Sequence, residues 1–593
     1  MKRRSFFNFL AAGIVVLLLI GIGGCNWLMR ESPLTLLGGG SQTTPAAAML
    51  VSKQSPVMVS LLVNPDRIKG WRRRSPLELN QLKTSLLANT GLEYRRDIQP
   101  WLGNEITLAV SSIDIDRDAE NGRQTGYLMA LATVDPAKSR EFLELLFSKR
   151  AIAGNENEVV VEQYKGVKLI YENPRPQMEK QNAVEHSPAK SVGMLSGAVV
   201  GDRFVLFANH PKVLRDAINN VQAPSLSLTS SSQYQQALSL LPPARIGVTF
   251  LNIPTLTMWC GLQPEAQTYQ SQIIALELKQ QGLLAETTLL ATSSDQEIYP
   301  PAPELSQPVG ALQYIPAGTG FSILGSDLAH LKNTDLNQLW KQVSAQLSGS
   351  GAKSPEIDSD RKLAGYDAIS RLVNQPLAAL EARWGIDLPQ DIFSWVQGEY
   401  ALGVLPNSDQ KPPDLVFVAE KSDAAEQGIS RLDTNASSQG LSISSLNLGE
   451  QKISAWTQLT TAPVSYTEPD GASITLKAKV QGVHATVGKY EIFTTSVEAM
   501  DKALKAPQSG SLVDNPKFQA GIAPIPQPNK GYLYLDWTAS QEILERQLPI
   551  LKLLEVLGNP FFSKVRSLTI SSYGSDKGLL KGSVFFHTAR TLR

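Results

Sequence analysis

The chain contains few cysteines, and it has no excess of charge of either sign. Cys25 and Cys260 are the only two cysteines among 593 residues. If Cys25 carries a lipid, the rest of the chain has no intrachain disulfide, and its stability must come from core burial. The 55 basic residues balance the 55 acidic ones. A near-neutral body gives no electrostatic reason to expect a nucleic acid as its partner.

The sequence also lacks the usual signatures of catalysis. It contains no Gly-x-Ser-x-Gly nucleophile elbow and no phosphate-binding loop. The histidines have no spacing typical of a metal site, and they are His186, His210, His330, His484 and His587. We therefore assign no catalytic residue and no cofactor from the sequence, which leaves an enzyme of unfamiliar type as an open alternative.

The N-terminus has the layout of an export signal. Met1-Lys2-Arg3-Arg4 is basic, and residues 6–24 are apolar apart from one asparagine. Ile22-Gly23-Gly24-Cys25 resembles a lipoprotein cleavage site, which would make Cys25 the point of lipid attachment. The alternative is an uncleaved anchor helix from residue 6 to about residue 29, which is long enough to span a bilayer. Both interpretations predict a membrane-anchored, extracytoplasmic body, on the periplasmic side or in the thylakoid lumen.

One sequence pattern occurs twice in the chain. Residues 97–105 read Asp-Ile-Gln-Pro-Trp-Leu-Gly-Asn-Glu, and residues 391–399 read Asp-Ile-Phe-Ser-Trp-Val-Gln-Gly-Glu. Further matches follow in the same order, as Val200-Gly201 with Val487-Gly488 and Gly282-Leu283-Leu284 with Gly578-Leu579-Leu580. This spacing is too long for a solenoid or a propeller, so we expect a duplicated whole domain. The predicted parts are an export signal or anchor at 1–25, a flexible tether at 26–54, a first repeat at 55–295, a proline-rich linker at 296–310 and a second repeat at 311–593.

Each predicted repeat combines strands with inserted helices. Helix starts are expected at Asp135-Pro136, His210-Pro211, Ser422-Asp423 and Ser496, where capping residues precede apolar periodicity. Strand patterns precede these helices, and hairpins near 273–291 and 568–586 end the two repeats. We therefore predict an α+β fold, with two tandem duplicated domains of mostly antiparallel sheet after an N-terminal membrane anchor.

The repeated segment, the export leader and the tandem layout together resemble DUF3352, a family of uncharacterised bacterial proteins found among cyanobacteria. The resemblance covers most of the chain from about residue 50. The residues that carry it are Asp97, Trp101, Gly103 and Glu105, with Asp391, Trp395, Gly398 and Glu399 in the second copy. The glycine lies one place later in that copy, which indicates a structural turn and not a fixed catalytic geometry. The resemblance implies no reaction, because the family has none assigned.

The repeated carboxylates have a chemical and a structural interpretation. Asp97 with Glu105, and Asp391 with Glu399, would be pairs for acid–base catalysis. In the structural interpretation, which we adopt, each aspartate caps a short helix, each glutamate begins a strand and is exposed, and the tryptophans anchor the core.

An acidic loop is the candidate metal site. Asp114, Asp116, Asp118 and Glu120 alternate along it, as in loops whose oxygen ligands converge on Ca²⁺. However, Ala119 stands where an EF-hand loop has its glycine, and the flanking segments are predicted strands. A solvated hairpin loop is the alternative that we favour.

For function, we expect a membrane-tethered, non-enzymatic protein that binds or organises a partner in the cell envelope. The alternative is a carrier for a lipid or another apolar ligand, held in a cavity lined by hairpins such as 283–291 and 579–586. The sequence does not identify this protein or lipid partner.

Overall fold

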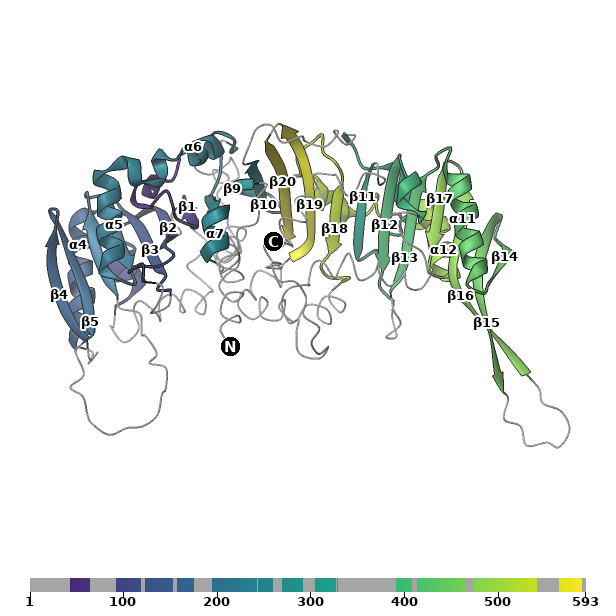
Figure 1. Cartoon of the computed structure of the whole chain (residues 1–593), viewed down its shortest axis with the longest axis horizontal. Helices are drawn as coiled ribbons and strands as arrows, with labels where there is room; N and C mark the ends of the chain where they lie inside the picture. Colours follow the sequence, from purple (N-terminus) through teal and green to yellow (C-terminus); the bar gives the residue numbers. More distant parts are fainter. Residues whose placement is uncertain are drawn as a thin grey trace. The chain divides into compact units, whose positions relative to one another are not determined.

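In the computed structural model (Figure 1), the described residues are 43–63, 92–118, 123–152, 157–174, 195–242, 244–259, 269–291, 304–326, 328, 391–407, 413–463, 474–540, 565–576 and 578–588. The chain forms two compact units, Met1–Ser294 with Thr591–Arg593, and Asp295–Arg590. In the part of the chain that is described, no helix is both long and apolar enough to cross a membrane. The prediction of a flexible tether at 26–54 is wrong for its described part, because Ala46–Leu50 forms a short helix whose Ala47 and Ala48 are fully buried. The predicted boundaries of the repeats and the linker stay predictions.

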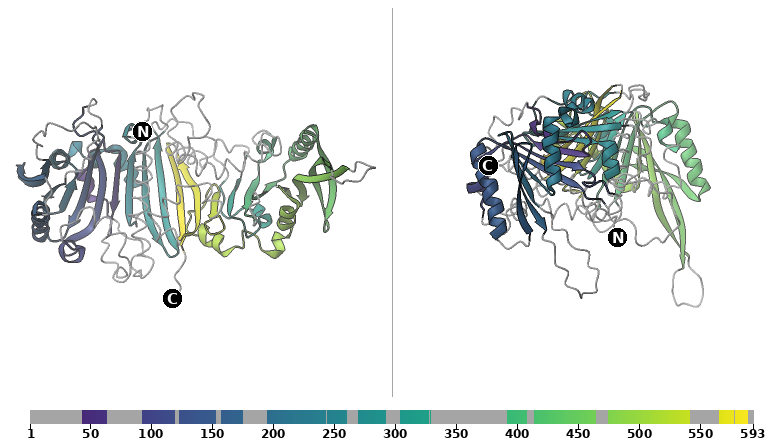
Figure 2. Two further views of the ribbon diagram at one scale, coloured as in Figure 1. Left: turned by 90° about the horizontal axis from the view of Figure 1, so that it is seen from below. Right: turned by 60° about the vertical axis from the view of Figure 1, so that its left-hand side comes forward.

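The described strands of the first unit lie side by side (Figure 2), and their pairings are antiparallel. These are β1 (Val57–Leu61), β2 (Leu102–Ser112), β3 (Gly126–Thr133), β4 (Asn157–Tyr164), β5 (Val167–Pro174), β6 (Ser196–Val200), β7 (Phe204–Ala208), β8 (Gly247–Asn252), β9 (Tyr269–Lys279) and β10 (Gly282–Ala291). Their order across the sheet is β10-β9-β8-β1-β2-β3-β7-β6-β5-β4. Among the described strands, β2 pairs with β3, β4 with β5, β6 with β7 and β9 with β10 as hairpins, and the β9–β10 hairpin is the one predicted near 273–291.

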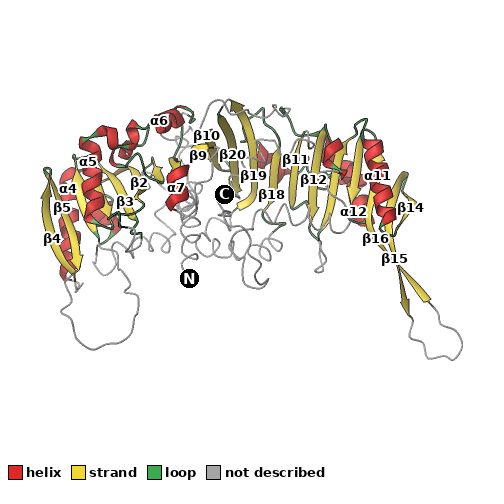
Figure 3. Cartoon of the chain, viewed as in Figure 1, coloured by secondary structure: helices red, strands yellow, loops and turns green. Residues whose placement is uncertain are grey.

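Helices cover both faces of this sheet (Figure 3). They are α4 (Pro136–Ile152), α5 (Pro211–Gln222), α6 (Ser232–Ser239) and α7 (Ile253–Trp259), with the short helices η1 (Ala46–Leu50), η3 (Tyr94–Ile98), η4 (Pro224–Leu226) and η5 (Leu228–Ser230). Gly197 lies against Leu143 of α4, whereas Gly126, whose side of the sheet is the opposite one, lies against Val213 of α5. The predicted starts of α4 and α5 are confirmed, and the His210 ring accepts a hydrogen bond from the Lys212 N–H.

The second unit is likewise built on antiparallel strands. Its strands are β11 (Phe321–Ser326), β12 (Glu399–Leu405), β13 (Asp414–Glu420), β14 (Leu441–Leu448), β15 (Gln451–Pro463), β16 (Ile474–Val487), β17 (Tyr490–Thr494), β18 (Tyr532–Asp536), β19 (Val565–Asp576) and β20 (Leu579–Thr588). They follow the order β20-β19-β18-β11-β12-β13-β17-β16-β15-β14. Strand for strand, this is the order of the first unit.

The described helices of the second unit are α11 (Ala425–Ser438), α12 (Val497–Ser509) and α13 (Pro516–Ile522), with the short helices η6 (Gly310–Tyr314) and η8 (Phe393–Trp395). The Ser496 hydroxyl accepts from the Ala499 N–H at 3.1 Å, which confirms the predicted cap of α12. The predicted start of α11 at Ser422 is wrong, because the helix begins at Ala425. The Ser422 hydroxyl instead donates to the Trp395 carbonyl at 2.8 Å.

Each unit has a core cluster around a tryptophan. Trp101 belongs to a cluster with Phe142, Phe147 and Phe207 in the first unit. Trp395 belongs to a cluster with Phe417, Phe493 and Trp456 in the second. The predicted α+β class, with mostly antiparallel sheet, is confirmed.

Candidate functional site: the repeated tryptophan and glutamate

The tryptophan of the repeated segment is a core anchor in both units. Trp101 and Trp395 are each 1% exposed. The Trp101 Nε1–H donates to the Asp97 carbonyl at 2.7 Å, and the Trp395 Nε1–H donates to the Asp391 carbonyl at 2.8 Å. The backbone of the aspartate, and not its carboxylate, is therefore the partner of the ring in each unit.

Each ring packs against the helix that follows β3 or β13, which is α4 in the first unit and α11 in the second. Trp101 contacts Phe142 of α4, with ring centroids 5.3 Å apart. Trp395 lies 6.2 Å from Phe493 of β17 and directly under Gly428 of α11. A β-carbon at Gly428 would come within 2.5 Å of the Trp395 Nε1, so α11 approaches the ring at a distance that only glycine permits.

We expect Gly428→Ala to destabilise the second unit. Overpacking against a buried ring costs about 1–3 kcal/mol, which exceeds the gain of at most about 1 kcal/mol that alanine has over glycine inside a helix. Hydrogen exchange of peptides from β12 and β17 measures the loss in the full chain. The matched control is Ser430→Ala, on an exposed position of the same helix, which we expect to be neutral or slightly stabilising. Unchanged protection in Gly428→Ala would contradict the close approach.

The glutamate of the first repeat fastens a distant short helix to β2. Glu105 accepts from the Ala46 N–H at 2.9 Å and from the Ala47 N–H at 2.8 Å. The Thr107 hydroxyl donates to the same carboxylate at 3.0 Å and lies 2.7 Å from the Ser60 hydroxyl. These amides open η1, where a negative charge compensates unpaired N–H groups. The prediction that this glutamate is exposed is wrong, because Glu105 is only 8% exposed.

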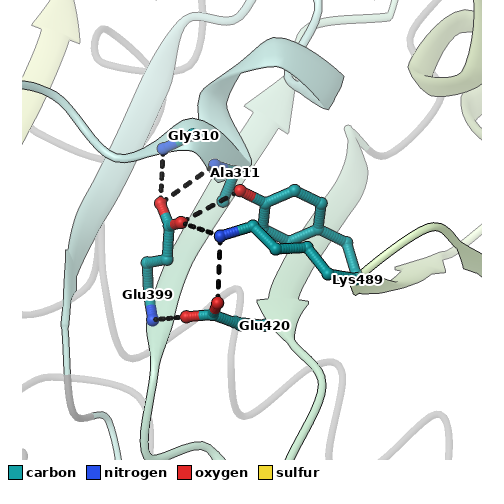
Figure 4. Close-up of polar contacts among 6 residues, drawn as sticks. Gly310, Ala311, Glu399, Glu420 and Lys489 are labelled. Carbon is teal, nitrogen blue, oxygen red and sulfur yellow. Dashed lines mark hydrogen bonds and ion pairs between the residues drawn. The ribbon is translucent and has the colours of Figure 1, made fainter.

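The glutamate of the second repeat makes the same contact with η6. Glu399 accepts from the N–H groups of Gly310 and Ala311 (Figure 4). Its other oxygen accepts from the Lys489 ammonium at 2.8 Å and from the Tyr490 hydroxyl at 3.0 Å. The repeated glutamate therefore has one shared role, which is to hold the first turn of a short helix against the strand.

A second carboxylate joins this group in the second unit only. Glu420 accepts from Lys489 at 2.9 Å and from the Glu399 backbone N–H at 3.2 Å (Figure 4). The corresponding positions of the first unit are Ala132 and Arg203, because Ala132 pairs with Phe204 as Glu420 pairs with Tyr490. In both units the cation lies over the next ring, at 5.9 Å for Arg203 on Phe204 and 5.1 Å for Lys489 on Tyr490.

These surroundings shift the pKa values of the two glutamates in opposite directions. Burial raises the pKa of Glu105 above its ordinary value, and its hydrogen bonds offset this only in part. Burial also opposes ionisation of Glu399, but the hydrogen bonds from Lys489 and Tyr490 outweigh it, so its pKa is lowered. Burial together with the Glu399 carboxylate raises the pKa of Tyr490 to about 12. The Glu399 group is therefore arranged to keep this carboxylate ionised.

Residues 10–588 match the family described as "Protein of unknown function (DUF3352)". The chain belongs to the DUF3352 family. This confirms the resemblance seen in the sequence, and it adds no reaction. No curated protein matches the chain.

Among solved structures, crystal forms I and III of TP0453 are similar to this DUF3352 protein at 8% and 9% sequence identity. They cover 43% and 45% of this chain and 81% and 90% of their own, with a TM-score of 0.23 in both cases. A likeness this low carries no argument about fold or function.

The aspartates and glutamates of the DUF3352 motif bind different partners and do not form carboxylate pairs. Asp97 lies inside η3, accepts from the Glu93 N–H at 2.7 Å and forms an ion pair with Arg96 at 3.0 Å. The prediction that it caps a following helix is therefore wrong. Desolvation of this carboxylate is outweighed by its bonds to Arg96 and Glu93, so its pKa is lowered. Asp391 precedes η8 and provides the carbonyl for the tryptophan of its unit.

The acidic loop uses two of its carboxylates to hold its own backbone. Asp114 accepts from the Gln124 N–H at 3.1 Å, and Asp116 accepts from the Gln124 side chain at 3.0 Å. Asp116 also accepts from the Asp118 N–H at 3.1 Å. Within the described residues, no group of three or more histidine, cysteine, aspartate or glutamate side chains is placed to hold a metal ion. Glu120 and the predicted lipidation site Cys25 lie outside the described residues.

The sequence reasoning missed Lys489, Tyr490 and Glu420 as partners of the motif glutamate. A signal was present, because the repeated Val-Gly pair directly precedes the turn that carries Arg203 in one unit and Lys489 in the other. Gly201 and Gly488 both have a φ of +58°, which explains why the turn keeps its glycine.

Proposed function

We propose that this DUF3352 protein is a membrane-tethered, extracytoplasmic, non-enzymatic protein that binds or organises a partner in the cell envelope. The observation that carries the proposal is the shared use of the repeated motif. In both units its tryptophan holds the aspartate carbonyl and its glutamate holds a short helix. The most distinctive residues of the family motif are therefore explained by folding, which favours an interaction protein over an enzyme built on this motif.

We further propose that the two units arose by duplication. Three observations support this: the common strand order, the common glutamate contact, and an edge-to-face ring pair between a helix and a strand. Tyr234 of α6 meets Phe250 of β8 at 5.1 Å, and Phe518 of α13 meets Tyr534 of β18 at 5.0 Å. The tyrosine is on the helix in the first unit and on the strand in the second, but the ring pair itself is kept. This is the pattern expected of two diverged copies.

The tether rests on the leader sequence. Its basic start and apolar run favour export, and the tether would be either a lipid on Cys25 after Ile22-Gly23-Gly24 or an uncleaved anchor helix that ends near residue 29. Either form would hold the body outside the cytoplasm, on the periplasmic side or in the thylakoid lumen.

A binding surface is favoured by the exposed apolar side chains of β14 and β15. Ile443 is 41% exposed, Leu446 is 44% exposed and Leu459 is 52% exposed. By the pairing register, Ile443 lies on one face of the β14–β15 pair, and Leu446 and Leu459 lie on the other, so both faces offer an apolar side chain to a partner.

Native mass spectrometry of the membrane-extracted protein, compared with its denatured intact mass, tests the proposal. We expect the chain in the membrane fraction, with a native spectrum that contains only protein. A denatured mass that begins at Cys25 and includes acyl chains would establish the lipoprotein, whereas an intact Met1 would establish the anchor helix. Lipid-sized mass that denaturation removes would overturn the binding proposal in favour of the carrier. Recovery in the soluble fraction, without the leader and without a lipid, would overturn the tether.

A further inference from the structure

We propose that two copies of the chain associate through β14, which pairs antiparallel with the same strand of the second copy. The inference goes beyond the proposed function, because it depends on one strand edge and not on the tether or on an outside partner.

The first argument is that β14 is an open edge. Among the described strands it pairs only with β15, from Leu441 opposite Gln458 to Leu448 opposite Gln451. Every residue of β14 is exposed or half-buried. Alternate N–H and C=O groups on the far side of such a strand point away from its neighbour, and they form a template for another strand.

The second argument is that β14 lacks the features that protect edge strands. Its sequence, Leu-Ser-Ile-Ser-Ser-Leu-Asn-Leu, contains no charge and no proline. The strand at the same place in the first unit is β4, which carries Glu158 and Glu162. Glu162 is also engaged by the Arg215 guanidinium at 2.5 Å. Of the two equivalent edge strands, β4 therefore carries charged side chains and β14 carries none.

The third argument is symmetry, which favours a second copy as the occupant. A two-fold axis perpendicular to the sheet pairs one residue with its own copy, so the register of β14 is centred on Ser444 or Ser445. Neither register sets like charges against each other. Centring on Ser444 brings the two Ile443 side chains to diagonal positions, and centring on Ser445 does the same for Leu446.

The same pairing is unfavourable for β4. A register centred on Val160 would place Glu158 opposite Glu162 of the second copy, and two carboxylates directly opposite each other repel. The chain therefore contains its own negative control. A single pair of strands buries less surface area than a standard protein–protein interface. We therefore expect a weak dimer whose population depends on protein concentration.

Sedimentation velocity of the full chain in detergent, over a range of protein concentrations, tests the inference. We expect a monomer–dimer equilibrium whose dissociation constant rises at least about tenfold in Ile443→Lys and in Leu446→Lys. Both side chains are exposed, so neither substitution removes core packing. Val161→Lys, at a position of β4 that is 60% exposed, is the matched control and should leave the equilibrium unchanged.

Hydrogen exchange distinguishes loss of pairing from loss of folding. In the wild-type chain, the amides of β14 should gain protection as the concentration rises, while those of β12 and β13 stay constant. In the two lysine variants, only the gain in β14 should disappear. A chain that is monomeric at every concentration, or a dimer that the β14 variants leave intact, would overturn the inference without affecting the proposed binding function.

Discussion

Trp101→Ala is expected to lower the free energy of unfolding of the first unit by about 3–5 kcal/mol. The ring is 1% exposed and packs against Phe142 in a closed cluster, so its removal leaves a cavity that the neighbours fill only in part. Hydrogen exchange of the full chain measures the loss through peptides from β2 and β7. Trp395→Ala should have the corresponding effect on β12 and β17, because that ring belongs to the other core cluster.

The replacement of each tryptophan by phenylalanine separates packing from hydrogen bonding. Trp101→Phe keeps most of the buried area but removes the donor to the Asp97 carbonyl, so we expect a smaller loss, of about 1–3 kcal/mol. A loss below about 1 kcal/mol in Trp101→Ala would contradict the role of the ring as a core anchor. Equal losses in Trp101→Ala and Trp101→Phe would assign the effect to the hydrogen bond alone.

Local patterns predicted the elements that local interactions decide. The starts of α4, α5 and α12 follow from a capping residue or a proline next to apolar periodicity, and each of these starts is confirmed. The prediction that α11 starts at Ser422 is wrong because the Ser422 hydroxyl donates to the Trp395 carbonyl, earlier in the chain, and does not cap the helix. A cap and a tertiary contact use the same hydroxyl chemistry, and sequence does not distinguish them.

The candidate site was beyond prediction because its partners are distant in the chain. Glu105 reads as the polar start of a strand, but Ala47, whose amide it binds, lies 58 residues earlier. The Lys489 ammonium lies 90 residues from Glu399. The sequence shows that the glutamate is repeated. Only the fold shows that each copy binds the first turn of a short helix.

Glu105→Ala is expected to destabilise the first unit by about 1–3 kcal/mol. The substitution removes the acceptor of two backbone N–H groups and of the Thr107 hydroxyl, and Ala46 and Ala47 are joined to the sheet through it. The loss should appear in hydrogen exchange at η1 and β1. Glu141→Ala, at an exposed position of α4, is the control and should change the stability by less than about 0.5 kcal/mol. A loss no larger than that of the control would show that the carboxylate does not hold the helix.

The two repeated glutamates should contribute to the pH dependence of stability with opposite signs. The pKa of Glu105 is raised from 4.5, so the folded unit binds this proton more tightly than the unfolded chain does. Its contribution to stability is therefore complete below pH 4.5 and is lost as the pH rises through the raised value. The pKa of Glu399 is lowered from 4.5, so its contribution is present above pH 4.5 and is lost as the pH falls through the lowered value. Hydrogen exchange at several pH values, corrected for the intrinsic exchange rate, compares the wild-type chain with Glu105→Gln and with Glu399→Gln. In the first unit, the stability difference between the wild-type chain and Glu105→Gln should shrink as the pH rises, and in the second unit the difference for Glu399→Gln should shrink as the pH falls. The same direction of pH dependence in both of these differences would contradict the role of Lys489, since this cation helps to keep Glu399 ionised despite its partial burial.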